Sequence, residues 1–327
     1  MMKLRYLFNN PDLAEMLLKN WDYDQDSVGL FQNFRISANA VYSFLRDGGL
    51  YYLRFCPITE KRRENILAEL AFINFLRGRK YPALEPMRCK SGEYLVQQTT
   101  PWGEYYACVF KGVEGVSLEE TNLKEEIVFI YGACLGQLHQ LSSQYRPQTT
   151  ILRTHHTMLD WMETDLIEPG NQSSALNEID LLRKYFSALQ IDNDRYGLIH
   201  YDFELDNVFY DENRHACKVI DFDDMMLHWY GMDIVQALDS LERETDVDNF
   251  PQKKSVFLEG YRSQYVINED WIAAIPAFRR YGDLFRYTRI ARAIQEEWEN
   301  EPDWVRLLRK KLGQRMIKYA SEFGTPL

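Results

Sequence analysis

The chain of 327 residues lacks the features that mark membrane, secreted and nucleic-acid-binding proteins. No uncharged apolar run approaches the roughly 20 residues of a membrane-spanning helix, and residues 1–21 contain no apolar segment of signal-peptide length. Basic residues are outnumbered by acidic ones, 38 to 49, and the resulting net charge of −11 argues against a nucleic-acid-binding surface. We therefore expect a cytoplasmic protein that has neither a membrane nor a nucleic acid as its partner.

Cysteine is scarce and shows no paired spacing. The five cysteines are an odd number, and their spacing is not that of a metal site, so reduced and mostly buried thiols are expected. The chain also lacks internal repeats and low-complexity segments, and its 21 Tyr and 18 Phe exclude a disordered protein. A chain of this length can bury a large core, and two lobes are the natural expectation.

The residues that suggest chemistry lie in one stretch, Leu198 to Asp224, which reads LIHYDFELDNVFYDENRHACKVIDFDD. His200, Asp202 and Asn207 form an H-x-D-x-x-x-x-N pattern, and Asp221 follows after a segment long enough for a β-hairpin. Such a hairpin would return the chain to its start and place Asp221 beside Asn207. This pattern is typical of the catalytic and metal-binding loops of protein-kinase-type phosphoryl-transfer enzymes.

Phosphoryl transfer from ATP to a hydroxyl needs an oriented acceptor and neutralised phosphate charge more than covalent help. Asp202 is the candidate catalytic base, and His200 is the candidate residue that braces the catalytic loop. Mg²⁺ prefers hard oxygen ligands and keeps several waters, so one carboxylate and one amide, Asp221 and Asn207, suffice as protein ligands. The alternative is a pair of turn-forming residues beside an ordinary buried histidine.

The first 110 residues are expected to form a nucleotide-binding lobe with a five-stranded antiparallel sheet and a helix. The predicted strands span residues 28–31, 40–45, 50–55, 93–97 and 105–110. Residues 47–49 predict a tight turn, and residues 60–76 predict the helix. The loop at residues 33–39 corresponds to the phosphate-covering loop of kinases but contains no glycine. Asn39 is its candidate phosphate contact; an ordinary polar turn is the alternative.

Arg54 lies inside a predicted strand, where a charge needs a partner or a cleft. Kinases carry there a lysine that contacts phosphates and pairs with a helix glutamate. Glu69, in the middle of the following helix, is the preferred partner, and Glu64 is the second choice. Arginine can hold phosphate bidentately, so the role can survive the replacement, whereas an exposed edge-strand arginine is the alternative.

The glycines within residues 111–115 predict a hinge, at about 109–115, between a lobe of residues 1–110 and a mainly helical lobe of residues 111–327. In such a hinge adenine bonds to backbone groups, so Phe110 and Gly112 are the predicted contacts. A buried helix is expected over residues 127–138. Asp233 is interpreted as a helix N-cap.

With these features assembled, the chain resembles the aminoglycoside phosphotransferase and choline kinase family over nearly its whole length. The resemblance rests on residues 198–207, on residues 219–224, and on a segment that reads Tyr131-Gly132-x-x-Leu135-Gly136-x-Leu138-His139. It implies a bilobal α+β fold of the protein-kinase type, ATP or GTP as donor, Mg²⁺, and a small hydroxylated acceptor. It also implies Asp202 as the base, Asn207 and Asp221 as metal ligands, and Asp223 as an auxiliary group.

The chain departs from the family pattern in three places. Tyr201 stands where the family often has glycine, the phosphate-covering loop lacks glycine, and Arg54 replaces the usual lysine. The leading hypothesis is a Mg²⁺-dependent kinase that phosphorylates a small-molecule hydroxyl. A pseudokinase that only senses nucleotide and a protein Ser/Thr kinase of the same fold are the alternatives. The sequence determines neither the acceptor nor the oligomeric state.

Overall fold

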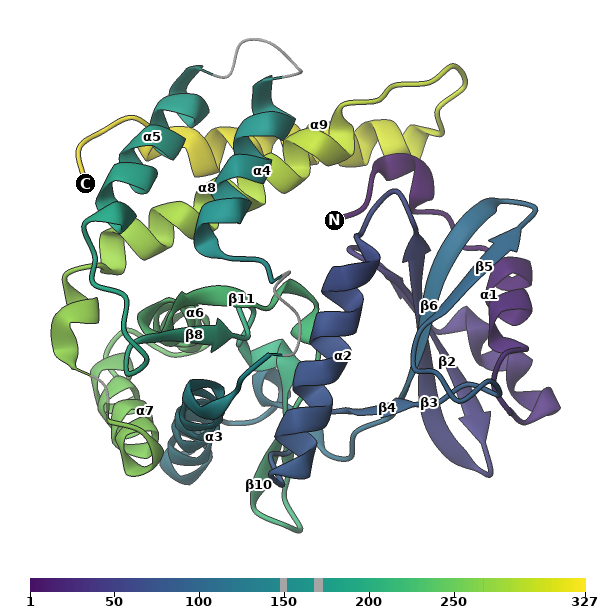
Figure 1. Ribbon diagram of the computed structural model, residues 1–327, viewed down its shortest axis with the longest axis horizontal. Coiled ribbons are helices and arrows are strands. Elements are labelled where there is room, and N and C mark those ends of the chain that lie inside the picture. Colours follow the sequence, from purple (N-terminus) through teal and green to yellow (C-terminus); the bar gives the residue numbers. More distant parts are fainter. Residues whose placement is uncertain (148–151, 168–172, 267) are drawn as a thin grey trace.

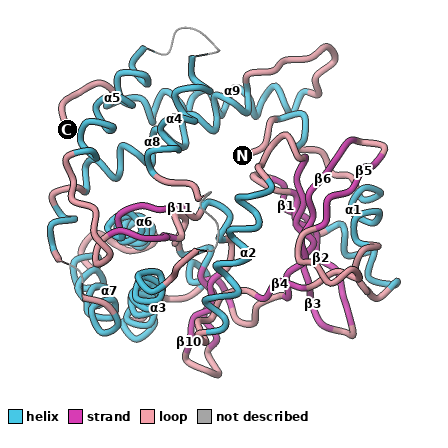
Figure 2. The backbone as a smooth tube through the Cα atoms, viewed as in Figure 1, coloured by secondary structure: helices cyan, strands magenta, loops and turns pink. Residues whose placement is uncertain are grey.

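The computed structural model describes residues 1–147, 152–167, 173–266 and 268–327. Figure 1 shows a sheet-rich part, formed early in the chain, beside a larger and mainly helical part. In Figure 2 the strands of the first part gather into one sheet, whereas a short strand pair in the second part is surrounded by helices. We call the two parts the N-terminal lobe and the C-terminal lobe. The α+β bilobal architecture is the predicted one.

The N-terminal lobe contains one antiparallel sheet, in the order β1-β2-β3-β6-β4, with β5 also paired to β6. Its strands are β1 (Phe34–Ile36), β2 (Ala40–Arg46), β3 (Gly49–Pro57), β4 (Glu85–Met87), β5 (Val96–Thr100) and β6 (Gly103–Lys111). Its helices are α1 (Pro11–Leu18), α2 (Arg63–Gly78) and a 3₁₀ helix at Gln25–Gln32. The amide oxygen of Asn10 caps α1 by accepting a hydrogen bond from the N–H of Leu13 at 3.0 Å.

The predicted five-stranded sheet is wrong in two respects. Residues 28–31 lie in a 3₁₀ helix, which begins where the hydroxyl and the N–H of Ser27 both donate to the carbonyl of Asp24. β1 and β4 were not predicted, because segments of three residues show too little alternation to be recognised. The described sheet therefore has six strands. The predicted turn is correct: Asp47 and Gly48 join β2 to β3, both with positive φ.

The C-terminal lobe is built mainly from helices around short strands. Its helices are α3 (Glu125–Gln144), α4 (His155–Ile167), α5 (Ser173–Ser187), α6 (Tyr230–Arg243), α7 (Phe250–Gln264), α8 (Ile275–Ile294) and α9 (Asp303–Tyr319). Its strands are β7 (Val116–Ser117), β8 (Tyr196–Ile199), β9 (Val208–Asp211), β10 (Ala216–Val219) and β11 (Met226–Trp229). The antiparallel pairs β8–β11 and β9–β10 carry the loops of the predicted catalytic stretch between them. α3 contains the predicted buried helix.

Strand alternation in β3 decides which side chains face which part of the core. Leu53 and Phe55 pack into a cluster with α1, whereas Cys56 belongs to the cluster that contains the apolar face of α2. Arg54, between Leu53 and Phe55, therefore points to the α2 side of the sheet. This alternation places the one charged residue of the strand opposite the helix that carries Glu69.

None of the described helices combines the length and apolar character that a bilayer crossing requires. All five cysteines are buried and are not joined in disulfides, in agreement with the expected reduced thiols. Burial raises the pKa of Cys56 to about 11 and that of Cys134 to about 12. These two thiols are therefore protonated and unreactive near neutral pH.

The glycines of the Tyr131-Gly132-x-x-Leu135-Gly136 segment allow α3 and α7 to pack closely. A Cβ atom on Gly132 would lie 2.0 Å from the carbonyl oxygen of Phe257, and one on Gly136 would lie 2.4 Å from that of Tyr261. Gly260, on the facing helix α7, meets the backbone of α3 equally closely, with 2.0 Å to the carbonyl oxygen of Phe129. The glycines thus bring the two helix backbones into direct contact.

Gly132→Ala should reduce the free energy of unfolding by about 3 kcal/mol or more, because two helix backbones must separate to admit the methyl group. Gly313→Ala is the matched control, since no atom lies within 4 Å of a Cβ placed there. The control should leave stability unchanged or raise it by up to about 1 kcal/mol, because alanine favours a helix over glycine. Denaturant unfolding measures both, and equal stabilities of the two variants would contradict the contact.

Candidate active site

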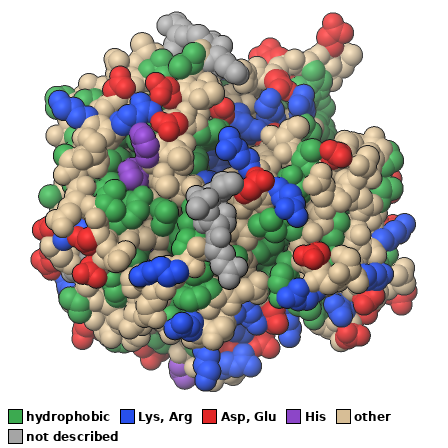
Figure 3. Space-filling model, viewed as in Figure 1, with side chains coloured by type: hydrophobic (Ala, Val, Ile, Leu, Met, Phe, Trp, Pro, Cys, Tyr) green, Lys and Arg blue, Asp and Glu red, His purple; other side chains and the backbone are tan. Residues whose placement is uncertain are grey.

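Part of the predicted catalytic stretch lines a cavity of about 320 Å³ to which both lobes contribute. Four carboxylates belong to its wall: Asp202, Asp221, Asp223 and Asp224. The rest of the lining consists of Met1, Leu7, Arg35, Ile36, Ser37 and Ala38 from the N-terminal lobe, and Arg289, Leu308, Leu312 and Arg315 from α8 and α9. Figure 3 shows acidic and basic side chains lying together along the junction of the lobes.

His200 braces the catalytic loop in the structure. Its Nε2 donates a hydrogen bond to the carbonyl of Ile220 at 2.8 Å, and its Nδ1 accepts one from the N–H of Asp202 at 3.2 Å. Burial lowers the pKa of His200, so the ring is neutral, as this pattern of one donor and one acceptor requires. The imidazole therefore connects Asp202 to the residue that precedes Asp221, which is the bracing position that the sequence analysis assigned to it.

Asp233 anchors the same loop through hydrogen bonds to its backbone. The prediction that it is a helix N-cap is wrong. It lies within α6, whose N-cap residue is Trp229, so it is not the N-cap. Its Oδ2 accepts the N–H of His200 and its Oδ1 accepts the N–H of Tyr201, both at 2.8 Å. His139 on α3 also donates to Oδ2, at 3.2 Å. This fully buried carboxylate thus fixes two successive backbone groups before Asp202.

Tyr201 occupies a backbone conformation that favours glycine. Its φ is +65°, in the left-handed region, which costs a residue with a side chain roughly 1–2 kcal/mol. The family often has glycine at this position, and the conformation explains why. In this chain the tyrosine ring packs edge-on against Tyr281 and Phe285 of α8, at centroid distances of 6.0 and 4.9 Å. These contacts offset part of the strain.

Asn207 and Asp202 are joined directly. The Asn207 amide nitrogen donates to the backbone oxygen of Asp202 at 3.0 Å and to its Oδ2 at 2.9 Å. Because the amide is planar, its carbonyl oxygen points away from Asp202 and can bind a cation. Burial raises the pKa of Asp202 well above its ordinary value, and the neighbouring Asp224 and Glu204 raise it further.

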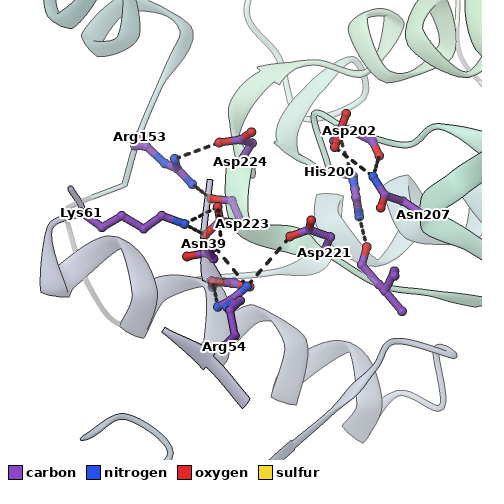
Figure 4. Close-up of polar contacts among 12 residues, drawn as sticks. Asn39, Arg54, Lys61, Arg153, His200, Asp202, Asn207, Asp221, Asp223 and Asp224 are labelled. Atoms are coloured by element: carbon purple, nitrogen blue, oxygen red, sulfur yellow. Dashed lines mark hydrogen bonds and ion pairs between the residues drawn. The ribbon is translucent and has the colours of Figure 1, made fainter. Parts of the chain in front are cut away.

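The β9–β10 hairpin returns Asp221 to the end of the catalytic loop, since the N–H of Ile220 donates to the carbonyl of Asn207 at 3.0 Å. Asp221 has φ +60° and a side chain that is 47% exposed. The low-dielectric wall and the nearby Asp223 raise its pKa. Arg54 lies 4.0 Å from its Oδ1, but among the described residues no side chain donates a hydrogen bond to this carboxylate, so a cation can still bind it (Figure 4).

Arg54 pairs with Glu69, the partner that the sequence analysis preferred over Glu64. Its two terminal nitrogens donate to the two carboxylate oxygens at 2.8 and 2.7 Å. Its guanidinium carbon also lies 4.8 Å from the centre of the Phe110 ring. Burial opposes the charged form, but the Glu69 carboxylate outweighs it and raises the pKa of Arg54. Arg54 is a buried, charged side chain inside the cleft and not an exposed edge residue.

Asp223 connects the N-terminal lobe to the loop that follows β10 and carries Asp221 (Figure 4). Asn39 donates to its Oδ2 at 3.2 Å, Lys61 binds both of its oxygens, and Arg54 lies 3.9 Å away. Burial alone would raise its pKa, but Lys61 and then Arg54 outweigh burial and lower it. Asp223 is therefore ionised. The glycine-free loop lines the cavity through residues 36–38 and contacts Asp223 through the side chain of Asn39.

Asp224 is held by arginines of the C-terminal lobe. Arg289 forms an ion pair with it, and Arg153 lies 3.8 Å from its Oδ1. These cations lower its pKa against the effect of burial. The contacts of Lys61, Arg153 and Arg289 were not predicted, because each joins residues far apart in sequence and no local pattern announces it.

The two predicted hinge contacts lie away from the cavity wall. Phe110 is buried beneath Arg54, and the N–H of Gly112 donates to the carbonyl of Leu50 at 2.8 Å. An adenine contact in this segment therefore falls to neighbouring backbone groups, and its position stays a prediction.

Comparison with known proteins places the chain in a family. The model of the phosphotransferase enzyme family matches residues 35–275. An amicoumacin kinase of Bacillus subtilis (strain 168) is 19% identical over 301 residues, which cover 87% of this chain and 85% of that protein. The chain belongs to the phosphotransferase enzyme family, and it is a kinase-type phosphotransferase with an alcohol group as acceptor.

Solved structures agree on the fold. An amicoumacin kinase in complex with AMP-PNP, Ca²⁺ and Ami has a TM-score of 0.77 at 21% identity, covering 99% of this chain and 97% of its own. A microcompartment-associated aminopropanol kinase has a TM-score of 0.70 at 19% identity, covering 96% of this chain and 97% of its own. The protein-kinase-like fold implied by the family resemblance is thereby confirmed.

Asp233→Asn should lower the free energy of unfolding by about 2–4 kcal/mol, because an amide has one acceptor oxygen and leaves a buried backbone N–H unpaired. Catalytic turnover should fall as well, since the backbone before Asp202 loses its anchor. Asp239→Asn is the control on the same helix. Asp239 pairs at the surface with Arg279, so its change should cost no more than about 1 kcal/mol. Equal losses in urea unfolding would contradict the anchoring role.

Proposed function

We propose that this chain transfers the γ-phosphoryl group of ATP, with Mg²⁺, to a hydroxyl of a small molecule. The observation that carries the proposal is the placement of Asp202 and Asp221 in the wall of one cavity, with Asn207 bonded to Asp202. Asn207 is oriented by its bonds to Asp202, and Asp221 is brought back by the β9–β10 hairpin. No observation favours a pseudokinase or a protein Ser/Thr kinase.

The free oxygen of Asn207 and the exposed carboxylate of Asp221 fit a hard divalent cation, which binds one or two protein oxygens and keeps waters and phosphates as its other ligands. Bound Mg²⁺ would neutralise the charge of the transferred phosphoryl group. The relative that was solved with AMP-PNP and Ca²⁺ supports an adenine nucleotide and a divalent cation as cofactors. GTP is the alternative donor, and binding measurements with both nucleotides will decide between them.

Asp202 would orient the acceptor hydroxyl and take its proton. Its raised pKa suits a base that must accept a proton during the reaction. The contacts from Asn207 and His200 fix the carboxylate and its backbone, so the acceptor meets a preorganised group. The acceptor would lie on the side of the cavity formed by Leu308 and Leu312 of α9. The names of the relatives, an amicoumacin kinase and an aminopropanol kinase, support a small-molecule acceptor, and we propose that the reaction takes place in the cytoplasm.

Asp202→Ala should reduce kcat by roughly 10²–10⁴-fold, because the general base is removed while the nucleotide site stays intact. ATP binding, followed by calorimetry, should change little. Asp206→Asn is the control in the same loop, since the one ion pair of Asp206 within the described residues is a 3.9 Å surface pair with Arg35. Retention of wild-type turnover by Asp202→Ala would refute the assignment of the base.

ATP and Mg²⁺ together should raise Tm by several degrees, because a ligand at a hundredfold excess over Kd stabilises the native state by about 2.7 kcal/mol. A thermal-shift series with ATP, GTP and ADP, each with and without Mg²⁺, measures this effect. Asp221→Asn should remove the Mg²⁺-dependent part of the shift. A shift that is the same with and without Mg²⁺ in the unmodified protein would count against the metal site.

A further inference from the structure

We propose that Lys61 is the lysine that contacts the nucleotide phosphates in this kinase, and that Arg54 is a fixed brace. The inference rests on the proposed function and assigns a residue to it. Lys61 lies in the connection between β3, which ends at Pro57, and α2, which begins at Arg63. It therefore reaches the cleft from outside the strand in which Arg54 stands.

The guanidinium of Arg54 is already held by other side chains of the protein. Both terminal nitrogens are used by the Glu69 carboxylate, the guanidinium stacks on Phe110, and the side chain is only 9% exposed. A bidentate hold on a phosphate requires two adjacent N–H groups that point at the same ligand. The fork of Arg54 that would provide them points at Glu69. A phosphate could bind this end-on pair of N–H groups only by breaking a buried ion pair, and the remaining N–H groups belong to a side chain that is only 9% exposed.

Lys61 contacts the segment that follows Asp221. Its ammonium binds both oxygens of Asp223, two residues after Asp221, and the same carboxylate accepts from Asn39 of the phosphate-covering loop (Figure 4). The ammonium is thus held between that loop and the residue proposed to bind the metal. The adjacent Glu60 forms an ion pair with Arg292 of α8 at 2.7 Å, which fixes the backbone of this connection.

The chemistry of the ammonium leaves room for a ligand. An ammonium has three N–H donors, and the two oxygens of Asp223 use at most two of them. Among the described residues, Asp223 is the one ion-pair partner of Lys61. A compact ammonium on a flexible stem can keep this contact and add a phosphate oxygen. The side chain is 17% exposed and its partner Asp223 lines the cavity, so a ligand next to Asp223 can approach the ammonium.

Binding of AMP, ADP and ATP, each with Mg²⁺, to the full chain tests this role by calorimetry. Lys61→Met keeps the apolar stem and removes the charge. It should weaken ATP binding by roughly tenfold to a hundredfold and leave AMP binding within about twofold, because AMP lacks the outer phosphates. Lys61→Arg restores a cation and should recover most of the lost ATP affinity. Lys90→Ala, an ion-paired lysine of the same lobe next to Asp22, is the control and should bind ATP normally.

The outcomes distinguish a Lys61 that contacts the phosphates from a Lys61 that only links the two lobes. Lower Tm without nucleotide, with an unchanged ratio of ATP to AMP affinity, would overturn the inference and make Lys61 only a link between the lobes. Equal ATP binding by Lys61→Met and the unmodified protein would overturn it as well, while the proposed function stands. If the unmodified protein binds no nucleotide with Mg²⁺, the proposed function fails and this inference fails with it.

Discussion

The hydrogen bonds from the backbone of His200 and Tyr201 to the buried carboxylate of Asp233 are the interaction on which the site depends. They hold Tyr201 in a left-handed conformation that its side chain disfavours, and that conformation turns the chain so that Asp202 reaches the cleft. His139 ties the same carboxylate to α3, whose glycines fix its contact with α7. The loop that carries Asp202 therefore takes its position from the packed helices α3, α6 and α7 of the C-terminal lobe.

Electrostatics distinguishes three carboxylates that lie within four residues of one another. Lys61 neutralises Asp223, and Arg289 and Arg153 neutralise Asp224, so both have lowered pKa values. Asp221 faces one cation at the limit of ion pairing, Arg54 at 4.0 Å from its Oδ1, and burial and Asp223 still raise its pKa. A divalent cation gains most where a carboxylate is uncompensated. Asp221 is thus the least compensated of the three, which suits the proposed metal ligand, and Asp223 connects the lobes.

Features set by local sequence could be predicted, and those set by distant contacts could not. The cap at Asn10 and the turn at Asp47 and Gly48 depend on a few adjacent residues, and the hairpin that returns Asp221 follows from chain length and turn chemistry. Arg54 and Glu69 could be paired because strand and helix periods place them face to face. By contrast, Lys61 and its partner Asp223 are 162 residues apart, and no local pattern connects them. The prediction of a strand at residues 28–31 is wrong because the hydrogen bonds from Ser27 to the carbonyl of Asp24 begin a 3₁₀ helix there, despite the apolar residues of the segment.

The β9–β10 ladder makes the closure of the site independent of the length of the turn at its far end. Val208 pairs with Val219 at the base of the hairpin, next to Asn207 and Ile220, while residues 212–215 are exposed at the tip. Insertions at the tip would leave the base in register, whereas deletion of a single residue within either strand would turn its side chains to the opposite face. The tip is thus a tolerant position for a peptide tag or a fluorophore. The strands β9 and β10 do not tolerate deletions in the same way.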